Sequence, residues 1–248
     1  PGVYSLGLDY YKDHFYCVGS SSKSLHKLDS NWKVVKKVII TDLDAHGVDC
    51  FDDKVVVTNP SGIHMEIFDT DLNLLEHIPI PLYEKAIHDN VFRHHINCAQ
   101  MDSNKSIYYS VTFMPQTDSP YHINRRDDGH IMKIVDGQHI SVVSGLYLPH
   151  SLQIKDDYLY VCNKKEYSVD KYTLDGELVS STGPLLDGWI RGLCPLDDDI
   201  WLVGLNSARC DSLPIDRKKV GILVLKEYDD RWKSLINLIY HFQKYLIS

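Results

Sequence analysis

Short apolar runs separated by acidic turns recur along the whole chain and predict β-strands rather than helices. The runs come in pairs, in which a first strand is followed by a turn and then by a strand rich in β-branched or aromatic residues. Five such pairs align, and their first strands begin at Gly7, Gly47, Ile96, Ser151 and Gly192. A self-similar pattern at this spacing predicts a repeat architecture.

Each pair is followed by a third strand, and four of the pairs also show a fourth. The third strands are expected within residues 25–29, 65–69, 131–134, 169–172 and 220–225, and the fourth within 32–35, 72–75, 139–142 and 178–180. Four strands repeated five times predict an all-β, five-bladed β-propeller as a single domain. The expected blades are 3–43, 44–91, 92–147, 148–188 and 189–228. The sequence leaves open whether a missing N-terminal segment supplies the fourth strand of the last blade.

The repeat resembles those of NHL-type and glutaminyl-cyclase-type propellers. The residues that carry the resemblance are Leu159-Tyr160-Val161-Cys162-Asn163 and then Tyr172-Thr173-Leu174-Asp175-Gly176, and the likeness extends over roughly residues 3 to 228. It implies the fold but not the cyclase activity, which needs an acidic residue in the pocket. Glycoside hydrolysis is also disfavoured: Asp9 and Asp49 occupy equivalent positions, but Cys98, Gln153 and Cys194 fill the others.

The C-terminal residues 229–247 depart from the repeat and contain neither Gly nor Pro. Their apolar residues follow helical spacing, at Trp232, Leu235, Ile236, Ile239, Phe242 and Leu246. Asp229-Asp230 at one end and Lys244 near the other suit a helix dipole. We therefore expect a C-terminal helix that covers an exposed strand at the edge of a blade.

Composition excludes several partners. The 248 residues have a formal net charge of −8, without a long basic tract, which argues against nucleic acid or an anionic membrane. No apolar stretch is long enough to span a bilayer. The six cysteines form no CxxC pair, and most lie in apolar strand-like runs. They are expected to be free and buried in a reducing compartment, which favours a cytoplasmic location; three disulfides are the alternative.

The position immediately before each first strand carries the candidate chemistry. These five residues are Leu6, His46, His95, His150 and Arg191. In a propeller the innermost strands line the central channel, so the three histidines are expected to converge at one mouth of it. Three imidazoles can hold a divalent transition metal, with zinc, iron or copper (and also nickel) compatible, and leave one position open. The sequence thus predicts His46, His95 and His150 as metal ligands.

Neighbouring residues extend this site. Arg191 is expected to anchor a substrate carboxylate or phosphate, and His94 to act as a general base, an alternate ligand or an outer hydrogen-bonding group. Long loops at 112–129 and 206–219 are expected to form the pocket walls, with His122 and Arg125 contacting substrate. Asn59 and Asn163, which end second strands, are expected to orient a ligand. Ordinary insertions at loop tips would produce the same loop lengths.

Two functions from different classes follow from this pattern. The preferred hypothesis is a metal-dependent enzyme that acts on a small polar or anionic substrate at the channel mouth. The alternative is a non-catalytic propeller that binds a small molecule, a glycan or a peptide there. Histidines that serve only in packing, or a metal-free pocket of His and Arg, would also account for the pattern. The sequence does not identify the reaction, the substrate, the metal or the oligomeric state.

Overall fold

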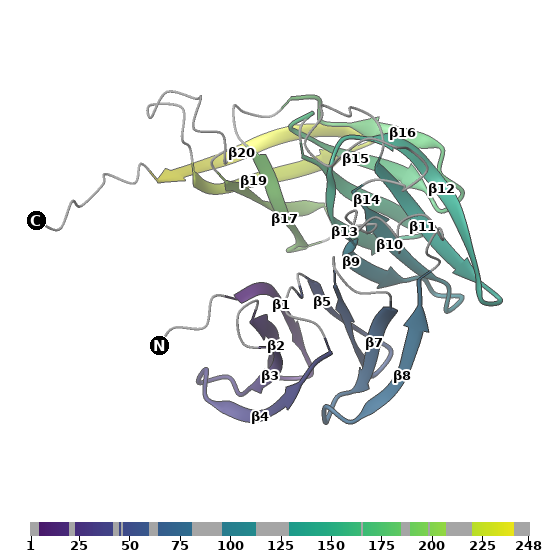
Figure 1. The fold of residues 1–248 in the computed structure, drawn as a ribbon. Coiled ribbons are helices and arrows are strands. Elements are labelled where there is room, and N and C mark those ends of the chain that lie inside the picture. The colour runs from purple at the N-terminus through teal and green to yellow at the C-terminus, as the bar shows by residue number, and fades with distance from the viewer. Residues whose placement is uncertain are drawn as a thin grey trace, which may run out of the picture. The chain divides into compact units, whose positions relative to one another are not determined.

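The computed structural model contains five four-stranded antiparallel sheets, one for each predicted repeat (Figure 1). It describes residues 5–19, 23–41, 45, 47–59, 64–80, 96–112, 129–164, 166–184, 189–197, 199–206 and 220–240. In every sheet the strands are ordered as they follow in the chain, so each sheet is a meander. The fold is therefore all-β and belongs to the five-bladed β-propeller class, as the sequence predicts.

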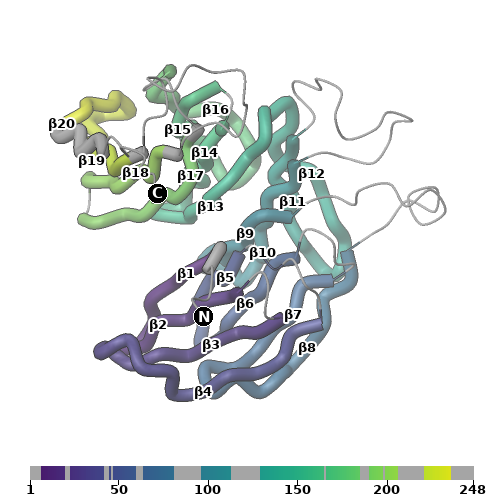
Figure 2. Tube along the Cα trace, turned by 60° about the vertical axis from the view of Figure 1, so that its left-hand side comes forward, coloured from purple at the N-terminus to yellow at the C-terminus, as the bar shows by residue number. Residues whose placement is uncertain are grey.

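The chain divides into two compact units, and the first, residues 1–146, contains three blades. Figure 2 shows the order of β1 to β4 within blade 1. Blade 1 comprises β1 (Ser5–Tyr11), β2 (His14–Gly19), β3 (Ser24–Leu28) and β4 (Val34–Ile39). Blade 2 comprises β5 (Gly47–Phe51), β6 (Lys54–Thr58), β7 (His64–Asp69) and β8 (Leu74–Pro79). Blade 3 comprises β9 (Ile96–Met101), β10 (Ile107–Val111), β11 (Gly129–Val135) and β12 (Gln138–Leu146).

The second unit, residues 147–248, contains the other two blades. Blade 4 comprises β13 (Pro149–Lys155), β14 (Tyr158–Asn163), β15 (Ser168–Thr173) and β16 (Leu178–Ser181). Blade 5 comprises β17 (Trp189–Pro195), β18 (Ile200–Asn206), β19 (Val220–Tyr228) and β20 (Arg231–Tyr240). The boundary between the units falls next to the expected start of blade 4.

The acidic turns predicted from the sequence close two-residue hairpins. Lys12-Asp13, Asp52-Asp53 and Asp156-Asp157 each connect the first two strands of a blade, and both residues of each turn have a positive φ between 46° and 62°. This is the conformation that a type I′ hairpin turn requires. Asp136-Gly137 forms the same kind of turn between β11 and β12, with φ values of 51° and 75°.

Apolar side chains fill the space between neighbouring blades within each unit. One core cluster joins blades 1 and 2 through residues such as Tyr16, Val48 and Phe68, and another joins blades 2 and 3. In the second unit, Trp201 and Tyr160 belong to the cluster that joins blades 4 and 5. Burying each large aliphatic side chain contributes roughly 1.5–3 kcal/mol, so these interfaces hold adjacent blades together.

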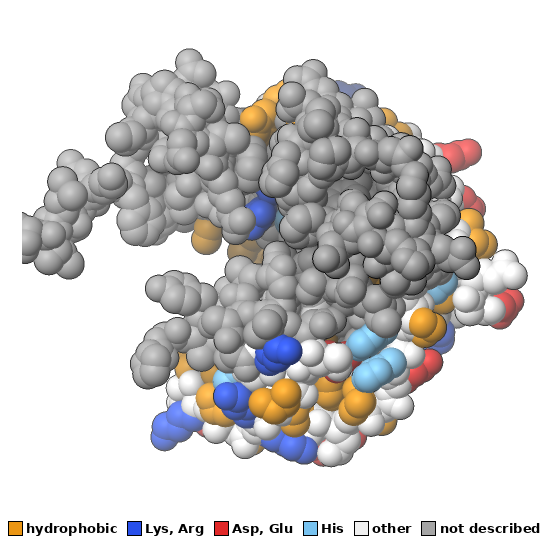
Figure 3. All heavy atoms as spheres, viewed as in Figure 1, with side chains coloured by type: hydrophobic (Ala, Val, Ile, Leu, Met, Phe, Trp, Pro, Cys, Tyr) orange, Lys and Arg blue, Asp and Glu red, His pale blue; other side chains and the backbone are white. Residues whose placement is uncertain are grey.

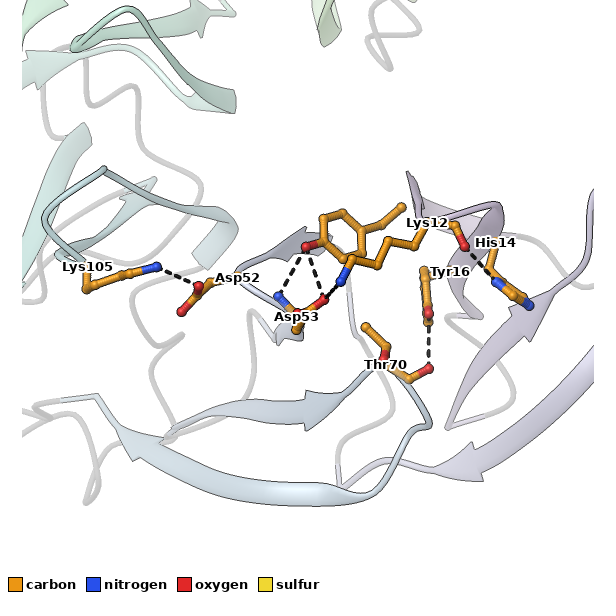
Figure 4. Close-up of polar contacts among 8 residues, drawn as sticks. Lys12, His14, Tyr16, Asp52, Asp53, Thr70 and Lys105 are labelled. Atoms are coloured by element: carbon orange, nitrogen blue, oxygen red, sulfur yellow. Dashed lines mark hydrogen bonds and ion pairs between the residues drawn. The ribbon is translucent and has the colours of Figure 1, made fainter.

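Polar contacts between hairpin turns supplement the apolar packing in the first unit (Figure 4). Lys12, in the turn of blade 1, pairs with Asp53 in the turn of blade 2. Lys105 of blade 3 pairs with Asp52 of the same blade 2 turn. The turn residues thus link three successive blades, although the exposure of these charges limits what each pair contributes.

The predicted C-terminal helix is wrong, because residues 231–240 form strand β20. β20 pairs with β19 along its whole length, and Figure 1 shows it, in yellow, beside that strand. Asp229 and Asp230 have φ values of 43° and 60° and make a hairpin turn rather than a helix start. Pairing with β19 provides blade 5 with its fourth strand, and this tertiary demand outweighs the helical spacing of the apolar residues. Residues 241–247 of the predicted helix lie outside the described residues.

Five of the six cysteines belong to the described part of the chain, and these five are free thiols. Cys98 and Cys162 are buried, as the sequence predicts, whereas Cys194 is exposed. Cys210 lies outside the described residues. Among the residues that the structure describes, no helix has the length and apolar character needed to cross a membrane.

Candidate functional site

His150 lies at the start of the innermost strand of blade 4, where the strand is irregular. The pairing of β13 with β14 shifts register between His150 and Gln153, and the flanking Leu148 and Ser151 have φ values of 57° and 54°. Bulges of this kind re-aim a side chain, and strained backbone gathers at functional sites. The buried ring is oriented by a 3.0 Å contact between Nδ1 and the carbonyl oxygen of Leu148. Because a carbonyl oxygen only accepts, Nδ1 is the donor in this contact, and in the neutral ring Nε2 then carries the lone pair.

Arg191 is the residue of blade 5 that the sequence repeat aligns with His150, and in the structure it lies within a bulge of β17. The pairing of β17 with β18 shifts register between Ile190 and Leu193, and Gly192 has a φ of 85°. The two positions are linked directly, because the backbone N–H of Gly192 donates to Ser151 Oγ at 2.8 Å. A Cβ at Gly204 would lie 2.1 Å from the carbonyl oxygen of Arg191, so only glycine permits this approach of β18 to β17.

Several predicted site residues lie outside the described residues. They are the histidines His46, His94 and His95, together with His122 and Arg125 of the first long loop. The same holds for residues 113–128 and 207–219 of the two loops. The members of the predicted channel-mouth site that the structure describes are therefore His150, Arg191, Asn59 and Asn163, and the convergence of the three histidines stays a prediction.

The two asparagines predicted to orient a ligand are both buried at the ends of second strands. Asn59 follows β6 and is 3% exposed, and Asn163 ends β14 and is 7% exposed. Asn163 accepts a hydrogen bond from the backbone N–H of Tyr147 at 2.9 Å and donates one to Asp170 at 3.1 Å. These bonds give Asn163 a structural function within its unit, and its contact with a ligand stays a prediction.

Asp9 and Asp49, at equivalent positions of β1 and β5, join the innermost strands of successive blades. Asp9 accepts a hydrogen bond from the backbone N–H of Cys50 at 2.6 Å, and Asp49 accepts one from Ala99 at 3.0 Å. Burial raises the pKa of Asp49 to about 7, although hydrogen bonds from Ala99 and Gln100 oppose the shift. Burial also raises the pKa of the Cys50 thiol, which disfavours a thiolate nucleophile there.

A second cluster of possible metal donors was not predicted from the sequence. His64, Glu66 and His77 of blade 2 offer ligand atoms that all lie within 4.8 Å of one another. Period-two alternation places His64 and Glu66 on one face of a strand. The tight turn after Asp69 then brings His77 opposite Glu66. The available sequence signal was the pattern His-x-Glu, followed by a histidine two residues beyond the next predicted strand at 72–75.

These features define the chain's class, the five-bladed β-propeller. A comparison with known protein families matches residues 14–230 to the family described as "Domain of unknown function (DUF4915)". The match covers most of the chain, and the protein belongs to this family. A search of curated protein sequences finds no match.

Solved structures share the fold at low sequence identity. A luciferin-regenerating enzyme is 13% identical, with a TM-score of 0.64, over 96% of this chain and 76% of that one. A virginiamycin B lyase from Staphylococcus aureus is 10% identical, with a TM-score of 0.60, over 94% and 70%. The calcium-binding protein regucalcin from Agrobacterium tumefaciens is 11% identical, with a TM-score of 0.61, over 96% and 74%. The fold thus includes enzymes, and identities this low show the fold alone.

Proposed function

We propose that this protein is a metal-dependent enzyme that acts on a small polar or anionic substrate at the predicted mouth of the propeller channel. The predicted ligands are His46 and His95, which directly precede the innermost strands of blades 2 and 3, and His150, which lies at the start of the innermost strand of blade 4. The metal is a divalent transition ion, zinc, iron or copper. Such an ion, when bound, supplies Lewis acidity and lowers the pKa of a coordinated water.

The observation that carries the proposal is the repeated bulge at the start of β13 and β17. In β13 His150 is the last paired residue before the bulge, whereas in β17 Arg191 lies within it, and each directly precedes a residue with positive φ. Two neighbouring blades thus have a bulge at the predicted metal ligand His150 and at the cationic Arg191. A shared site explains this repetition better than independent packing roles would.

The side chains have complementary functions in this proposal. The contact between His150 Nδ1 and the Leu148 carbonyl leaves Nε2 as the coordinating atom, an arrangement common to histidines that bind metals. The planar guanidinium of Arg191 binds a carboxylate or phosphate of the substrate through paired hydrogen bonds. His94, next to the predicted ligand His95, is the candidate general base.

Elemental analysis of the purified full-length protein tests the proposal. The variants His95→Ala, His150→Ala and their double combination should each lose the same single equivalent of metal, because all three remove one shared site. His139→Ala is the matched control, because this histidine lies on the outer strand β12 and contacts Tyr109. The control should keep its metal.

Two results would contradict the proposal. The first is a wild-type protein that contains no transition metal and takes none up when reloaded. The second is a His150→Ala variant that keeps the full metal content of the wild type. Either would favour the non-catalytic binding propeller, in which ligand affinity does not depend on a metal.

A further inference from the structure

The outer strands of blade 2 bring together two imidazoles and a carboxylate on one face. His64 and Glu66 are two residues apart on β7, so their side chains point the same way. His77 on β8 is the direct cross-strand partner of Glu66, and His64 is its diagonal neighbour. Figure 3 shows histidine side chains, in pale blue, at the surface where Figure 1 places β7 and β8.

The turn that joins the two strands holds this register. Asp69 Oδ1 accepts hydrogen bonds from the backbone N–H groups of Asp71 and Asn73, at 2.9 and 2.8 Å. The Asn73 side chain donates to the other carboxylate oxygen of Asp69 at 2.8 Å. Because the register is fixed, the three donor side chains face one another before any ligand binds, which lowers the entropic cost of binding.

Glu66 is a buried carboxyl group that hydrogen bonds from Thr41 hold in place. Its side chain is only 6% exposed. Thr41, in the segment that follows β4, donates its hydroxyl to Oε1 at 2.8 Å and its backbone N–H to both carboxylate oxygens at 3.2 Å. Such hydrogen bonds orient metal-binding carboxylates in known sites. A buried carboxylate also requires a compensating cation.

Among the described residues, the side chain that can form an ion pair with Glu66 is His77 in its protonated form, and its Nε2 lies 3.8 Å from Oε1. This separation is too long for a direct hydrogen bond. Donors that share one tetrahedral zinc at about 2.0–2.1 Å lie about 3.4 Å apart, so side-chain rotations must bring the three donor atoms, which lie within 4.8 Å of one another, closer together to chelate an ion. The imidazole rings of His64 and His77 are nearly parallel, with centroids 4.3 Å apart, so both rings must turn to aim their lone pairs at one ion.

We propose that His64, Glu66 and His77 bind a divalent transition metal ion, with zinc as the first choice. Two imidazole nitrogens and one carboxylate oxygen suit zinc, and three protein donors leave a fourth position for water or another ligand. The His77 side chain is 43% exposed, so the ion can reach the site from solvent. This site is separate from the proposed channel-mouth site and does not depend on it.

Zinc titration of the metal-stripped, full-length protein against a chromophoric chelator tests this site. The wild type should bind one more equivalent of zinc than His77→Ala, and Thr41→Val should weaken that equivalent by about ten- to a hundredfold through loss of the Glu66 contact. His77 is exposed enough that its substitution should leave the metal-free fold intact, which circular dichroism checks. His14→Ala, on β2 of the same unit, is the matched control and should bind as the wild type does.

Parallel titration of His150→Ala separates the two proposals. Loss of one equivalent in His77→Ala, with that equivalent retained in His150→Ala, supports the blade 2 site whatever happens at the channel mouth. If His77→Ala and the wild type bind the same number of zinc ions with the same affinity, the blade 2 site is refuted, even where His150→Ala loses metal.

Discussion

Blades 1 and 2, and likewise blades 4 and 5, are linked by a tyrosine and a lysine that reach from one blade to the outer hairpin of the next. We call each of these contacts an outer joint. In the first unit, Tyr16 on β2 lies opposite Lys27 on β3. In the second unit, Tyr160 on β14 lies opposite Lys171 on β15. In both joints the tyrosine hydroxyl and the lysine amine reach the hairpin turn, or its flank, between the third and fourth strands of the next blade.

The two joints differ in what receives the lysine. Lys27 donates to Asp71, whose side chain is 76% exposed, and Tyr16 donates to the carbonyl oxygen of Thr70 at 3.0 Å (Figure 4). The positive charge of Lys27 thus meets a carboxylate that water already solvates. Such a pair contributes little to stability, because solvent screens the attraction.

Lys171, by contrast, donates to two carboxylates, Glu227 and Asp230, both at 2.8 Å. The Lys171 and Glu227 side chains are 9% and 12% exposed, and Tyr160 donates to the second oxygen of Glu227 at 3.0 Å. Burial lowers the pKa of Lys171, but the hydrogen bonds to Asp230 and Glu227 outweigh it, and the net pKa is raised. The two lysines occupy equivalent repeat positions, but their ion pairs contribute unequally to stability, because Asp71 is exposed and Glu227 is buried.

The largest expected effect is at the buried joint. Lys171→Met should lower the free energy of unfolding by about 3–5 kcal/mol, because it leaves Glu227 as a buried charge without its partner. Urea unfolding of the full chain measures the change. Adding Glu227→Gln to this variant should recover part of the loss, since it removes the uncompensated charge. Equal losses in Lys171→Met and in the corresponding Lys27 variant would contradict the comparison.

The second effect concerns the hydrogen bonds between the innermost strands of neighbouring blades, which we call the inner joints. The acceptor side chain is a carboxylate in the first unit and a hydroxyl in the second. Asp49 bonds to Ala99 in the first unit, and Ser151 bonds to Gly192 in the second. Burial raises the pKa of Asp49 from its ordinary 3.8 to about 7, so between these values the folded chain holds a proton that the unfolded chain has lost. The associated stability is fully present below pH 3.8 and is lost as the pH rises toward 7.

Asp49→Asn should therefore flatten the decline of stability with rising pH, by up to about 1.4 kcal/mol for each pH unit within that window. The measurement is the free energy of unfolding in urea at pH 5, 6 and 7 for variant and wild type. Ser151→Ala is the control, because it removes a neutral inner bond and should shift all three values equally. Parallel curves for Asp49→Asn and the wild type would show that the carboxylate does not titrate in this range.

The smallest effect is expected at the exposed joint. Lys27→Met should cost less than about 1 kcal/mol, because Asp71 stays solvated and the Tyr16 bond to Thr70 is kept. The same urea unfolding experiment measures it beside Lys171→Met. A loss as large as that of the buried joint would mean that burial of the partner is not what separates the two.

The repeat was predictable because it is local. The residue types of Asp52-Asp53 and Asp136-Gly137 are enough to predict hairpin turns, and the structure confirms both turns. The C-terminal strand was not predictable in this way. The apolar residues from Trp232 to Ile239 suit a helix by spacing, and only the unpaired edge of β19 makes β20 the better solution.

The candidate sites also have parts that were predictable from local sequence and parts that depend on strand pairing. The positions of His150 and Arg191 followed from the repeat, but the bulges that aim them depend on how β13 and β17 pair with their neighbours. The blade 2 cluster depends on register, because a shift of one residue would move His77 to the opposite face from Glu66. A search for metal-binding motifs of fixed spacing does not find this cluster, because its residues lie on two paired strands.

The sequence by itself determined the number of blades, the order of their strands, the turn chemistry and the candidate ligands at the strand starts, because each depends on residues close together in the chain. Tertiary structure decided the fate of the C-terminal segment, the raised pKa of Asp49, the unequal lysine joints and the meeting of His64, Glu66 and His77. These properties arise from burial and from strand pairing, and both are set by residues that are distant in sequence.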